Sequence, residues 1–245
     1  MINNDLQAKI ETFLQWVKES SRIVFFGGAG VSTESGIPDF RSVDGLYNQK
    51  YDFPPETILS HDFFYSNTED FYKFYRDKIL IEGAKPNVTH LALKKLEDEG
   101  KLSAVVTQNI DGLHEAAGSK TIYNLHGTAY KNYCNRCGKF FDADYIRNSK
   151  EMVPHCDKCG GVIKPDVVLY GEMLPDGAVY GAVDAIKKAD MLIIGGTSLT
   201  VYPAAGFVNY YKGTKLVLIN KQTTPYDQYA NLVLHCGLGE VFSKL

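Results

Sequence analysis

The sequence predicts an α/β fold built on a doubly wound parallel sheet. Three observations support this class. Short aliphatic runs typical of buried strands recur along the chain and alternate with amphipathic helical segments. Several of these runs end in glycine or in a cluster of polar residues, which is where an open parallel sheet binds its ligands. Two closely spaced pairs of cysteines interrupt the alternation and indicate a metal site within it.

The predicted strands are short and rich in β-branched and aromatic residues. We expect them at residues 23–26, 104–106, 121–125, 191–194, 216–219 and 232–234, with a further strand-like run at 163–170. The predicted helices carry apolar residues at every third or fourth position. They cover residues 6–19, 69–81, 87–99 and 176–188, and a short helix begins at Pro203. Most strands are therefore separated by helices, as a doubly wound sheet requires.

Length and composition exclude several classes of protein. The 245 residues are enough for one large domain or for one domain with an insert. The 26 Lys and Arg against 29 Asp and Glu give a net charge of −3. The sequence has no block of basic residues of the kind that would indicate nucleic-acid binding. No apolar run approaches the roughly 20 residues that span a bilayer, and the N-terminal residues lack the pattern of a signal peptide. We therefore expect a cytoplasmic protein that binds neither nucleic acid nor membrane directly.

The first strand runs directly into a glycine-rich loop at residues 27–41. Glycines at this place allow the backbone to approach a diphosphate, and the N-terminus of the following helix favours its charge. Gly28 and Gly30 fit the dinucleotide-binding fingerprint, whereas Thr33 occupies the place of its third glycine. No later strand ends in the acidic residue that a dehydrogenase uses for the ribose, about 20 residues further on. The loop thus favours a diphosphate ligand and disfavours a dehydrogenase.

Polar side chains follow two other predicted strands. Gln108, Asn109 and Asp111 come directly after the strand at 104–106, and His126 follows the strand at 121–125. Each group has an ordinary structural explanation, because polar residues cap helices and a lone histidine is more often structural than catalytic. Two polar strand ends separated by one helix nevertheless favour an active site.

The four cysteines Cys134, Cys137, Cys156 and Cys159 form two Cys-x-x-Cys pairs with eighteen residues between them. Two such pairs supply four thiolates in the tetrahedral arrangement that Zn²⁺ prefers. Four protein ligands leave no open coordination position, so we expect one structural zinc ion. The fifth cysteine, Cys236, lies outside this pattern and is expected to be buried.

Residues 42–67 are rich in Tyr, Pro, Asn and Asp and predict a long loop with little regular structure. Loops of this length are often functional covers. The loop and the two helices after it lie between the first and second strands of the predicted sheet. This region is therefore either an elaborate crossover or part of a second domain.

With these motifs in place, the chain resembles the sirtuins, a family of NAD-dependent protein deacylases. The resemblance covers nearly the whole chain and rests on residues 28–41 (GAGVSTESGIPDFR), 107–114 (TQNIDGLH), 125–127 (LHG), 164–172 (KPDVVLYGE), 196–205 (GTSLTVYPAA), the four cysteines, and Asn220 followed by Thr224-Pro225. It implies a single catalytic core over residues 1–245, with a Rossmann-type NAD-binding domain at about 1–41, 101–127 and 163–245. A helical module at about 42–100 and a zinc module at about 128–162 would form the small domain.

The resemblance also implies the residues that bind NAD as a co-substrate. They are Ala29, Thr33, Phe40, Arg41, Gln108, Ile110, Asp111, Thr197, Ser198, Asn220, Cys236 and Gly237. Asp111 would hold the carboxamide of the nicotinamide, and Phe40 would lie over its side of the site. For Arg41 an ion pair with Asp39 or Asp44 is the structural alternative.

The catalytic residues implied by the resemblance are His126 and Asn109, with His126 as general base. The acyl oxygen would attack the ribose carbon that releases nicotinamide, and a ribose hydroxyl deprotonated through His126 would then displace the amine. An imidazole with an ordinary pKa near 6.5 suits this task. The products would be free lysine, nicotinamide and O-acetyl-ADP-ribose.

An acetylated protein segment is implied as the partner, bound in extended form as an added strand. The residues along it would be Val168, Leu169, Tyr170, Gly171, Glu172 and Val201. Leu169 and Tyr170 replace two phenylalanines that many relatives carry, which alters the wall of the acyl tunnel. We expect a monomer.

The acyl preference is predicted from one helix. Relatives that prefer acidic acyl groups carry a Tyr and, three residues later, an Arg, and Tyr75 and Lys78 align with them. Alternatively, Tyr75 belongs to the core and Lys78 is a solvated charge. Lysine lacks the bidentate fork of arginine, so deacetylation is expected as the main activity and desuccinylation as a slow one. A deacylase for longer or acidic chains, a protein ADP-ribosyltransferase and a non-catalytic binding module are the alternative functions.

Overall fold

The central feature of the fold is a sheet of six parallel strands. The computed structural model describes residues 4–40, 45 and 51–245, so Arg41 and Asp44 lie outside the described residues. The strand order is β3-β2-β1-β7-β8-β9. The strands are β1 (Ile23–Gly27), β2 (Leu102–Thr107), β3 (Ile122–Asn124), β7 (Met191–Gly195), β8 (Leu216–Ile219) and β9 (Leu232–Leu234), all paired in parallel.

This strand order confirms the predicted doubly wound sheet. The chain moves outward from β1 through β2 to β3, then returns to the other side of β1 and moves outward again through β7, β8 and β9. The crevice beside the carboxyl ends of β1 and β7 is the point at which the direction of winding changes. In folds of this type ligands bind at that point.

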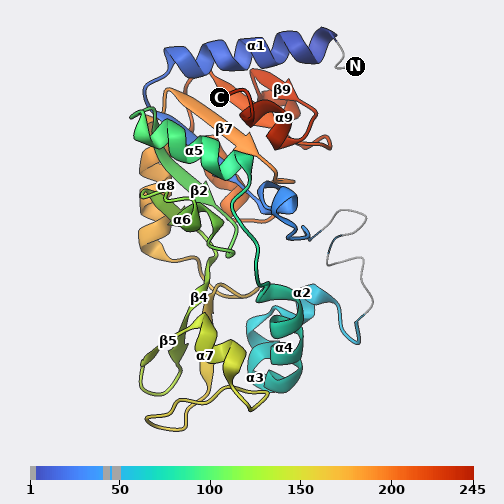
Figure 1. Ribbon diagram of the computed structural model, residues 1–245, viewed down its shortest axis with the longest axis vertical. Helices are drawn as coiled ribbons and strands as arrows, with labels where there is room; N and C mark the ends of the chain where they lie inside the picture. The colour runs from blue at the N-terminus through green and yellow to red at the C-terminus, as the bar shows by residue number, and fades with distance from the viewer. Residues whose placement is uncertain (1–3, 41–44, 46–50) are drawn as a thin grey trace.

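Helices cover both faces of the sheet (Figure 1). On one face α1 (Asn4–Glu19), α5 (Val88–Asp98) and α9 (Leu238–Phe242) pack against side chains such as Phe25, Val105 and Ile193. On the other face α8 (Asp176–Lys188) and η5 (Ala204–Tyr210) pack against Phe26, Val106 and Ile194. Successive residues of a strand point to opposite faces, so a strand covered on both sides is continuously apolar.

A smaller part of the molecule lies beyond the carboxyl ends of the main sheet, at the bottom of Figure 1. Its three-stranded antiparallel sheet has the order β5-β4-β6. The elements are β4 (Gly127–Cys134), β5 (Phe140–Asp142), α7 (Ala143–Asn148), β6 (Ile163–Val167), and the helices α2 (Pro55–Ile58), α3 (His61–Ser66) and α4 (Thr68–Phe74). These elements share one hydrophobic core.

Two segments differ from the predicted division between the parts. The strand β6 pairs with β4 in the small sheet, although its residues were assigned to the large domain. The helix α5 packs on the main sheet, although it was assigned to the helical module, because Leu93 and Leu96 belong to the core under α1. Sequence periodicity identifies a buried face but not the surface that buries it.

Two predicted elements differ in their local conformation. The loop predicted at 42–67 contains the helices α2 and α3 among its described residues. The helix predicted at 69–81 is divided into α4 and a π-helical turn, η4 (Tyr75–Ile79). Such turns often occur at functional sites. In the described part of the chain we find no helix with the length and apolar character needed to cross a membrane.

Candidate active site

A cavity of about 750 Å³ lies where the carboxyl ends of the main strands meet the small part. Except for Arg41, all the residues predicted to bind NAD, to catalyse, or to contact the substrate line this one cavity. Most of them come from the loops after β1, β2, β3, β6, β7, β8 and β9, and Tyr75 and Lys78 come from η4. The structure therefore places around one cavity the described residues that the resemblance implies for the site.

The first glycine loop packs directly against the second. The backbone N–H of Gly30 donates to the carbonyl oxygen of Gly196 at 2.8 Å, and that of Gly28 donates to Gly195 at 3.2 Å. A Cβ atom at Gly30 would lie 2.8 Å from Cα of Gly196, and one at Gly28 would lie 2.7 Å from Cβ of Thr197. Real side chains do not tolerate such distances. These glycines are therefore required by the contact between two loops, in addition to any contact with a diphosphate.

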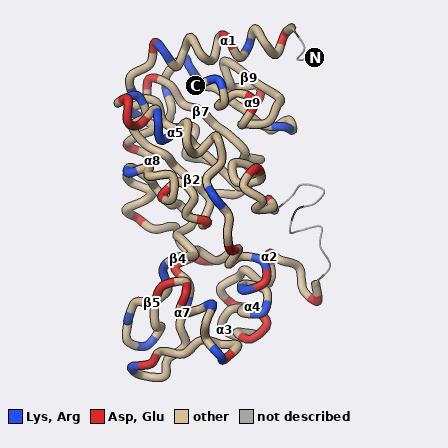
Figure 2. The backbone as a smooth tube through the Cα atoms, viewed as in Figure 1, with Lys and Arg blue, Asp and Glu red and all other residues tan. Residues whose placement is uncertain are grey.

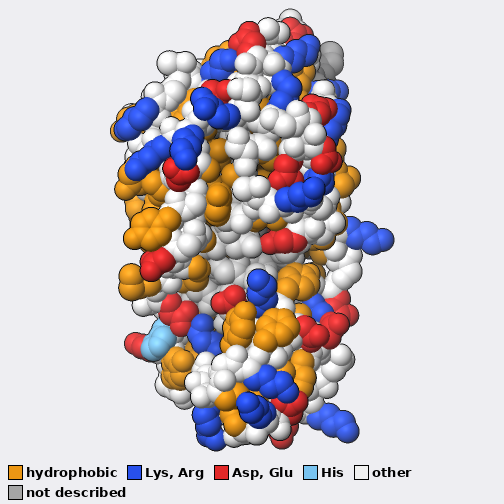
Figure 3. Space-filling view, turned by 90° about the vertical axis from the view of Figure 1, so that its left-hand side faces the viewer, with side chains coloured by type: hydrophobic (Ala, Val, Ile, Leu, Met, Phe, Trp, Pro, Cys, Tyr) orange, Lys and Arg blue, Asp and Glu red, His pale blue; other side chains and the backbone are white. Residues whose placement is uncertain are grey.

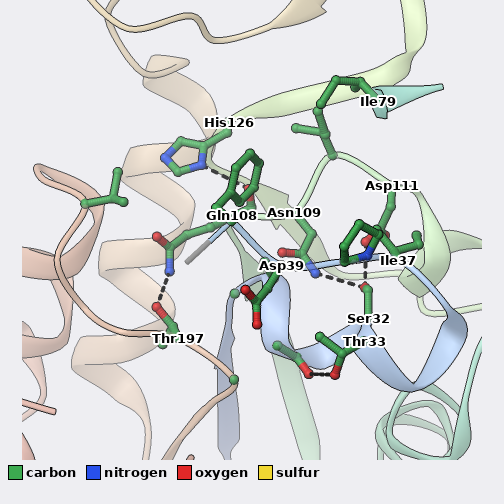
Figure 4. A pocket seen from close by; sticks show the side chains of 18 of the residues that line it. Ser32, Thr33, Ile37, Asp39, Ile79, Gln108, Asn109, Asp111, His126 and Thr197 are labelled. Carbon is green, nitrogen blue, oxygen red and sulfur yellow. Dashed lines mark hydrogen bonds between the residues drawn. The ribbon is translucent and has the colours of Figure 1, made fainter. Parts of the chain in front are cut away.

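A partly buried polar cluster forms one end of the cavity (Figure 4). The hydroxyl of Ser32 donates to Oδ2 of Asp111 at 2.6 Å and accepts from Nδ2 of Asn109 at 3.1 Å. The other carboxylate oxygen of Asp111 accepts from the backbone N–H of Leu113 at 2.9 Å. Burial raises the pKa of Asp111, and these two hydrogen bonds oppose the rise. The cluster offers carboxylate and amide groups that suit an amide-containing ligand.

Ser32 is the residue of this cluster that the sequence did not single out. It lies between the two short 3-10 helices η1 (Ala29–Val31) and η2 (Thr33–Ser35) and is fully buried. A serine in a glycine-rich loop is ordinary, so the residue type carries little signal. Its importance follows from Asp111, which is distant in sequence and reaches it only through the parallel pairing of β1 with β2.

His126 lies on the opposite side of Gln108 from this cluster (Figure 4). Its Nδ1 is 2.9 Å from the backbone carbonyl oxygen of Gln108. A carbonyl oxygen can only accept, so Nδ1 carries the proton and Nε2 is left with its lone pair. Burial lowers the pKa of His126, and the hydrogen bond to Gln108 partly opposes this effect. The imidazole is therefore neutral at neutral pH and is able to act as a base.

The residue after His126 must be glycine. Gly127 has φ of +73°, and a Cβ atom there would lie 2.0 Å from the carbonyl oxygen of Asp166. Only glycine lets the chain enter β4 so close to β6. This contact places the imidazole beside residues 167–172, because the N–H of Val168 donates to the carbonyl oxygen of His126 at 3.0 Å.

The segment proposed to meet the substrate is also tied to the small part of the molecule. The N–H of Tyr170 donates to Leu59 and the N–H of His61 donates to Tyr170, each at 2.9 Å. A carboxylate oxygen of Glu172 accepts from the N–H of Leu169 at 2.9 Å and from Lys164 at 3.1 Å. Leu169 is buried in the core of the small part, whereas Tyr170 is 41% exposed. The two positions that depart from the common pattern therefore have different surroundings.

Tyr75 and Lys78 both line the cavity, but they differ in burial and in their partners. Tyr75 is fully buried and its ring stacks on Phe71, with centroids 5.5 Å apart and an interplanar angle of 15°. Its hydroxyl has no hydrogen-bond partner within the described ranges, and burial raises its pKa well above the ordinary value. Lys78 forms an ion pair with Asp77 at 2.9 Å. The burial of Tyr75 agrees with the alternative that it is a core residue. Its position on the cavity wall agrees with a role in the acyl site.

The residues predicted for the adenosine half line the far side of the cavity. Nδ2 of Asn220 donates to the carbonyl oxygen of Gln222 at 2.8 Å, and the hydroxyls of Ser198 and Thr200 are 2.8 Å apart. Cys236 is buried as predicted, and burial raises the pKa of its thiol to about 11. This cysteine is therefore a neutral thiol.

The four paired cysteines lie together in the small part. Their Sγ atoms are all within 4.8 Å of one another, with Cys134 and Cys159 at 3.4 Å and Cys137 and Cys156 at 3.7 Å. Four sulfur atoms about 2.3 Å from a tetrahedral zinc would be about 3.8 Å apart, so the donor set fits this metal. A Cβ atom at Gly161 would lie 2.9 Å from the Sγ of Cys134, so the second knuckle has no room for a larger residue.

Comparisons with known proteins agree with this arrangement. The Sir2 family profile matches residues 28–203. The NAD-dependent protein deacetylase of Clostridium acetobutylicum is 58% identical over 239 residues, covering 97% of this chain and 98% of its own. A solved complex of Sir2 with a peptide and NAD⁺ is 40% identical with a TM-score of 0.86, and Sir2Tm bound to a propionylated peptide is 39% identical with a TM-score of 0.86. Each structural comparison covers 96% of both chains. This chain therefore belongs to the Sir2 family, the sirtuins.

Proposed function

We infer that this protein is an NAD-dependent protein-lysine deacetylase. It would transfer the acetyl group of an acetylated lysine to ADP-ribose and release nicotinamide and free lysine. The observation that carries this function is one cavity that contains both a base with a free Nε2, at His126, and a partly buried polar cluster suited to an amide, at Ser32, Asn109 and Asp111. A protein that only bound NAD or acetyl-lysine would have no use for the base.

NAD would lie along the cavity with its nicotinamide end at the Ser32–Asp111 cluster. Asp111 would accept from the carboxamide N–H₂. The loop with Ala29 and Thr33 would contact the phosphates, and Ser198 and Asn220 would hold the adenosine half. Bound NAD supplies a ribose carbon from which nicotinamide can leave. The protein contributes the orientation of that carbon toward the acetyl oxygen.

His126 would accept a proton from a ribose hydroxyl at Nε2. Asn109 donates its amide N–H to Ser32, which leaves its side-chain oxygen as an acceptor that can orient the same ribose. The Gln108 carbonyl would stabilise the imidazolium that forms, because Nδ1–H already donates to it. Cofactor chemistry and proton transfer would therefore both depend on the segment that follows β2.

The substrate would bind as an extended segment along residues 168–172 and Val201. Zinc, when bound by the four cysteines, supplies no chemistry, because a four-ligand site has no open position. It would connect the turn after β4 to the turn before β6 and so keep β6 in register. Since residues 168–172 continue directly from β6, the metal would support the substrate edge.

We also propose that the protein works as a monomer in the cytoplasm, without binding nucleic acid. None of the five cysteines forms a disulfide, as is usual in a reducing compartment. Basic and acidic residues are interspersed along the described backbone (Figure 2), and so are their side chains over the face shown in Figure 3. Size-exclusion chromatography would test the monomeric state, and salt-dependent DNA retention would test the absence of nucleic-acid binding.

Mass spectrometry of one acetyl-lysine peptide incubated with NAD tests the function. We expect loss of the acetyl group, with nicotinamide and O-acetyl-ADP-ribose formed in equal amounts. A peptide that gained ADP-ribose would identify a transferase instead. Acetyl-lysine that persisted with no NAD consumed would identify a binding module, and reduced NAD would identify a dehydrogenase.

A further inference from the structure

Asn87 connects the first turn of α5 to the cofactor loop. It is the N-cap of α5, and its side-chain oxygen accepts from the N–H of Thr89 at 2.9 Å. Its amide nitrogen points away from the helix and donates to the carbonyl oxygen of Val31 at 2.8 Å and to the hydroxyl of Ser35 at 3.0 Å. Helix capping uses only the oxygen. The nitrogen therefore performs a second task that capping does not require.

The two groups that Asn87 holds lie on either side of Ser32. The Val31 carbonyl belongs to the peptide unit that leads into Ser32, and Ser35 lies one turn later in η2. Ser32 in turn holds Asp111 at 2.6 Å and Asn109 at 3.1 Å. The orientation of the Ser32 hydroxyl thus depends on a backbone unit that Asn87 fixes from outside the loop.

The other half of the same loop has a separate anchor. Gly28 and Gly30 hydrogen-bond to Gly195 and Gly196 at the end of β7. Thr33 makes its own hydrogen bond to the carbonyl oxygen of Gly30 at 3.0 Å. Removing the amide of Asn87 would therefore loosen the loop around Ser32 and leave its glycine end in place.

Asn87 itself is held rigidly. Its backbone N–H donates to Nδ1 of His90 at 3.3 Å, and His90 is fully buried. The ring of His90 packs against His114 with centroids 4.7 Å apart, and His114 lies in the short helix that follows Asp111. The first turn of α5 thus contacts both walls of the polar cluster, the Ser32 wall through Asn87 and the Asp111 wall through His90.

We propose that Asn87 is a positioning residue for the nicotinamide end of the site. It sets the orientation of Ser32 and, through Ser32, of Asp111 and Asn109, while it touches neither substrate nor cofactor. The inference rests on the proposed function, in which that cluster binds the carboxamide. It predicts that Asn87 affects the handling of nicotinamide and not the binding of ADP-ribose or of the peptide.

Two substitutions separate positioning from helix capping. Asn87→Ser and Asn87→Asp both keep a side-chain oxygen that caps α5. The serine is too short to reach Val31, and the aspartate cannot donate to a carbonyl. Asp142→Ser is the matched control, because Asp142 caps α7 through the N–H of Tyr145 and belongs to the small sheet.

The measurements are exchange of labelled nicotinamide into NAD, inhibition by nicotinamide, the Kd for ADP-ribose and KM for an acetyl peptide. In both Asn87 variants we expect exchange to slow about tenfold, which corresponds to about 1.4 kcal/mol, and nicotinamide to inhibit correspondingly less well. The Kd for ADP-ribose and KM for the peptide should stay within about twofold of the wild type. Asp142→Ser should change none of the four by more than that.

Unchanged exchange in both Asn87 variants would overturn the inference. An equal loss of ADP-ribose affinity would also overturn it, because Asn87 would then support the whole loop. The proposed function fails on a different result, namely a wild type that neither deacetylates the peptide nor exchanges nicotinamide.

Discussion

At the scale of single residues, the hydrogen bond between His126 and Gln108 decides which nitrogen can accept a proton. Nδ1 is committed to a backbone carbonyl, which cannot change its role as an acceptor. The tautomer is therefore fixed by the main chain and does not depend on a second titratable residue. This arrangement separates the base from the Ser32–Asp111 cluster, so the two stages of the reaction can be tested independently.

Replacing His126 with Ala should nearly abolish deacetylation and leave part of the nicotinamide exchange. The first stage needs no base, because nicotinamide leaves when the acetyl oxygen attacks. The measurement is a comparison of deacetylation with exchange of labelled nicotinamide, with Asp111→Asn as the matched variant, in which exchange should be damaged directly. Equal losses of both reactions in His126→Ala would contradict this separation.

The pH dependence of kcat/KM should reflect the buried state of His126. Because burial lowers its pKa from the ordinary value of 6.5, the base stays unprotonated somewhat below that pH. Activity should therefore fall as the pH decreases, with the midpoint of the acid limb below 6.5. A profile of kcat/KM at saturating NAD measures this midpoint. A midpoint above 6.5 would show that the imidazole is stabilised in its charged form.

At the scale of elements, α5 and α6 (Leu113–Ala116) meet through two buried imidazoles. Neither ring nitrogen of His114 has a hydrogen-bond partner in the described part of the chain, and the ring packs near Phe25. Burial lowers the pKa of His90 to about 4. Burial and the neighbouring His90 lower the pKa of His114 to about 3. The contact between the two elements thus requires both rings to be neutral.

This contact predicts a loss of stability in mild acid. The unfolded chain binds protons at both histidines below about pH 6.5, whereas the folded protein does not until about pH 4 or 3. The free energy of unfolding should therefore have its full value above pH 6.5. Below pH 6.5 it should decrease by about 1.4 kcal/mol per pH unit for each of the two histidines. Urea unfolding at several pH values measures the slope. His114→Phe should reduce this slope by the contribution of one histidine, about half. The exposed control His155→Gln should leave the slope unchanged.

The zinc knuckles give a second prediction at this scale. Cys159→Ala removes one of four ligands, so the metal should be lost and β4, β5 and β6 should lose their order, since metal binding and local folding are coupled. Elemental analysis and circular dichroism measure the two effects. Cys236→Ala is the control and should keep one zinc per chain. Full activity and a native Tm in zinc-free Cys159→Ala would show that the metal has no structural role.

At the scale of the whole molecule, the cavity lies at the junction of two hydrophobic cores. The residues proposed to bind NAD follow the strands of the main sheet, and the wall with Tyr75 and Lys78 comes from the small part. The acyl group would therefore extend into the small part while the reacting atoms remain at the sheet. Acyl preference and NAD chemistry should be separable by mutation.

Deacetylation should be the main activity, with desuccinylation slow. Lys78 can neutralise a carboxylate, but it is already paired with Asp77 and lacks a bidentate fork. The measurement is kcat/KM on acetyl and succinyl versions of one peptide. Lys78→Ala should lower kcat/KM for the succinyl peptide about threefold to tenfold. It should leave kcat/KM for the acetyl peptide unchanged. Lys73→Ala, at an exposed pair with Glu69, is the control. A wild type that preferred succinyl would overturn the prediction, and an unchanged ratio in Lys78→Ala would remove Lys78 from the acyl site.

The sequence by itself determined the local structure and the chemical motifs of this protein. The helix predicted at 87–99 is α5 at Val88–Asp98, and the strand predicted at 191–194 is β7 at Met191–Gly195. The cysteine spacing was sufficient to predict a cluster, because each knuckle closes within four residues. These features depend on residues that are close in the chain. Apolar periodicity, turn residues and ligand spacing record them directly.

Only the tertiary structure decided which distant groups meet. Ser32 and Asp111 touch because β1 pairs with β2, and Asn87 reaches Val31 because α5 packs on the main sheet. The tertiary structure also paired β6 with β4 in the small sheet, and it divided the helix predicted at 69–81 into α4 and a π-helical turn. Burial and hydrogen bonding between segments far apart in sequence are set by the path of the whole chain. No local pattern encodes them, so the geometry of the site emerges only when the two parts are folded together.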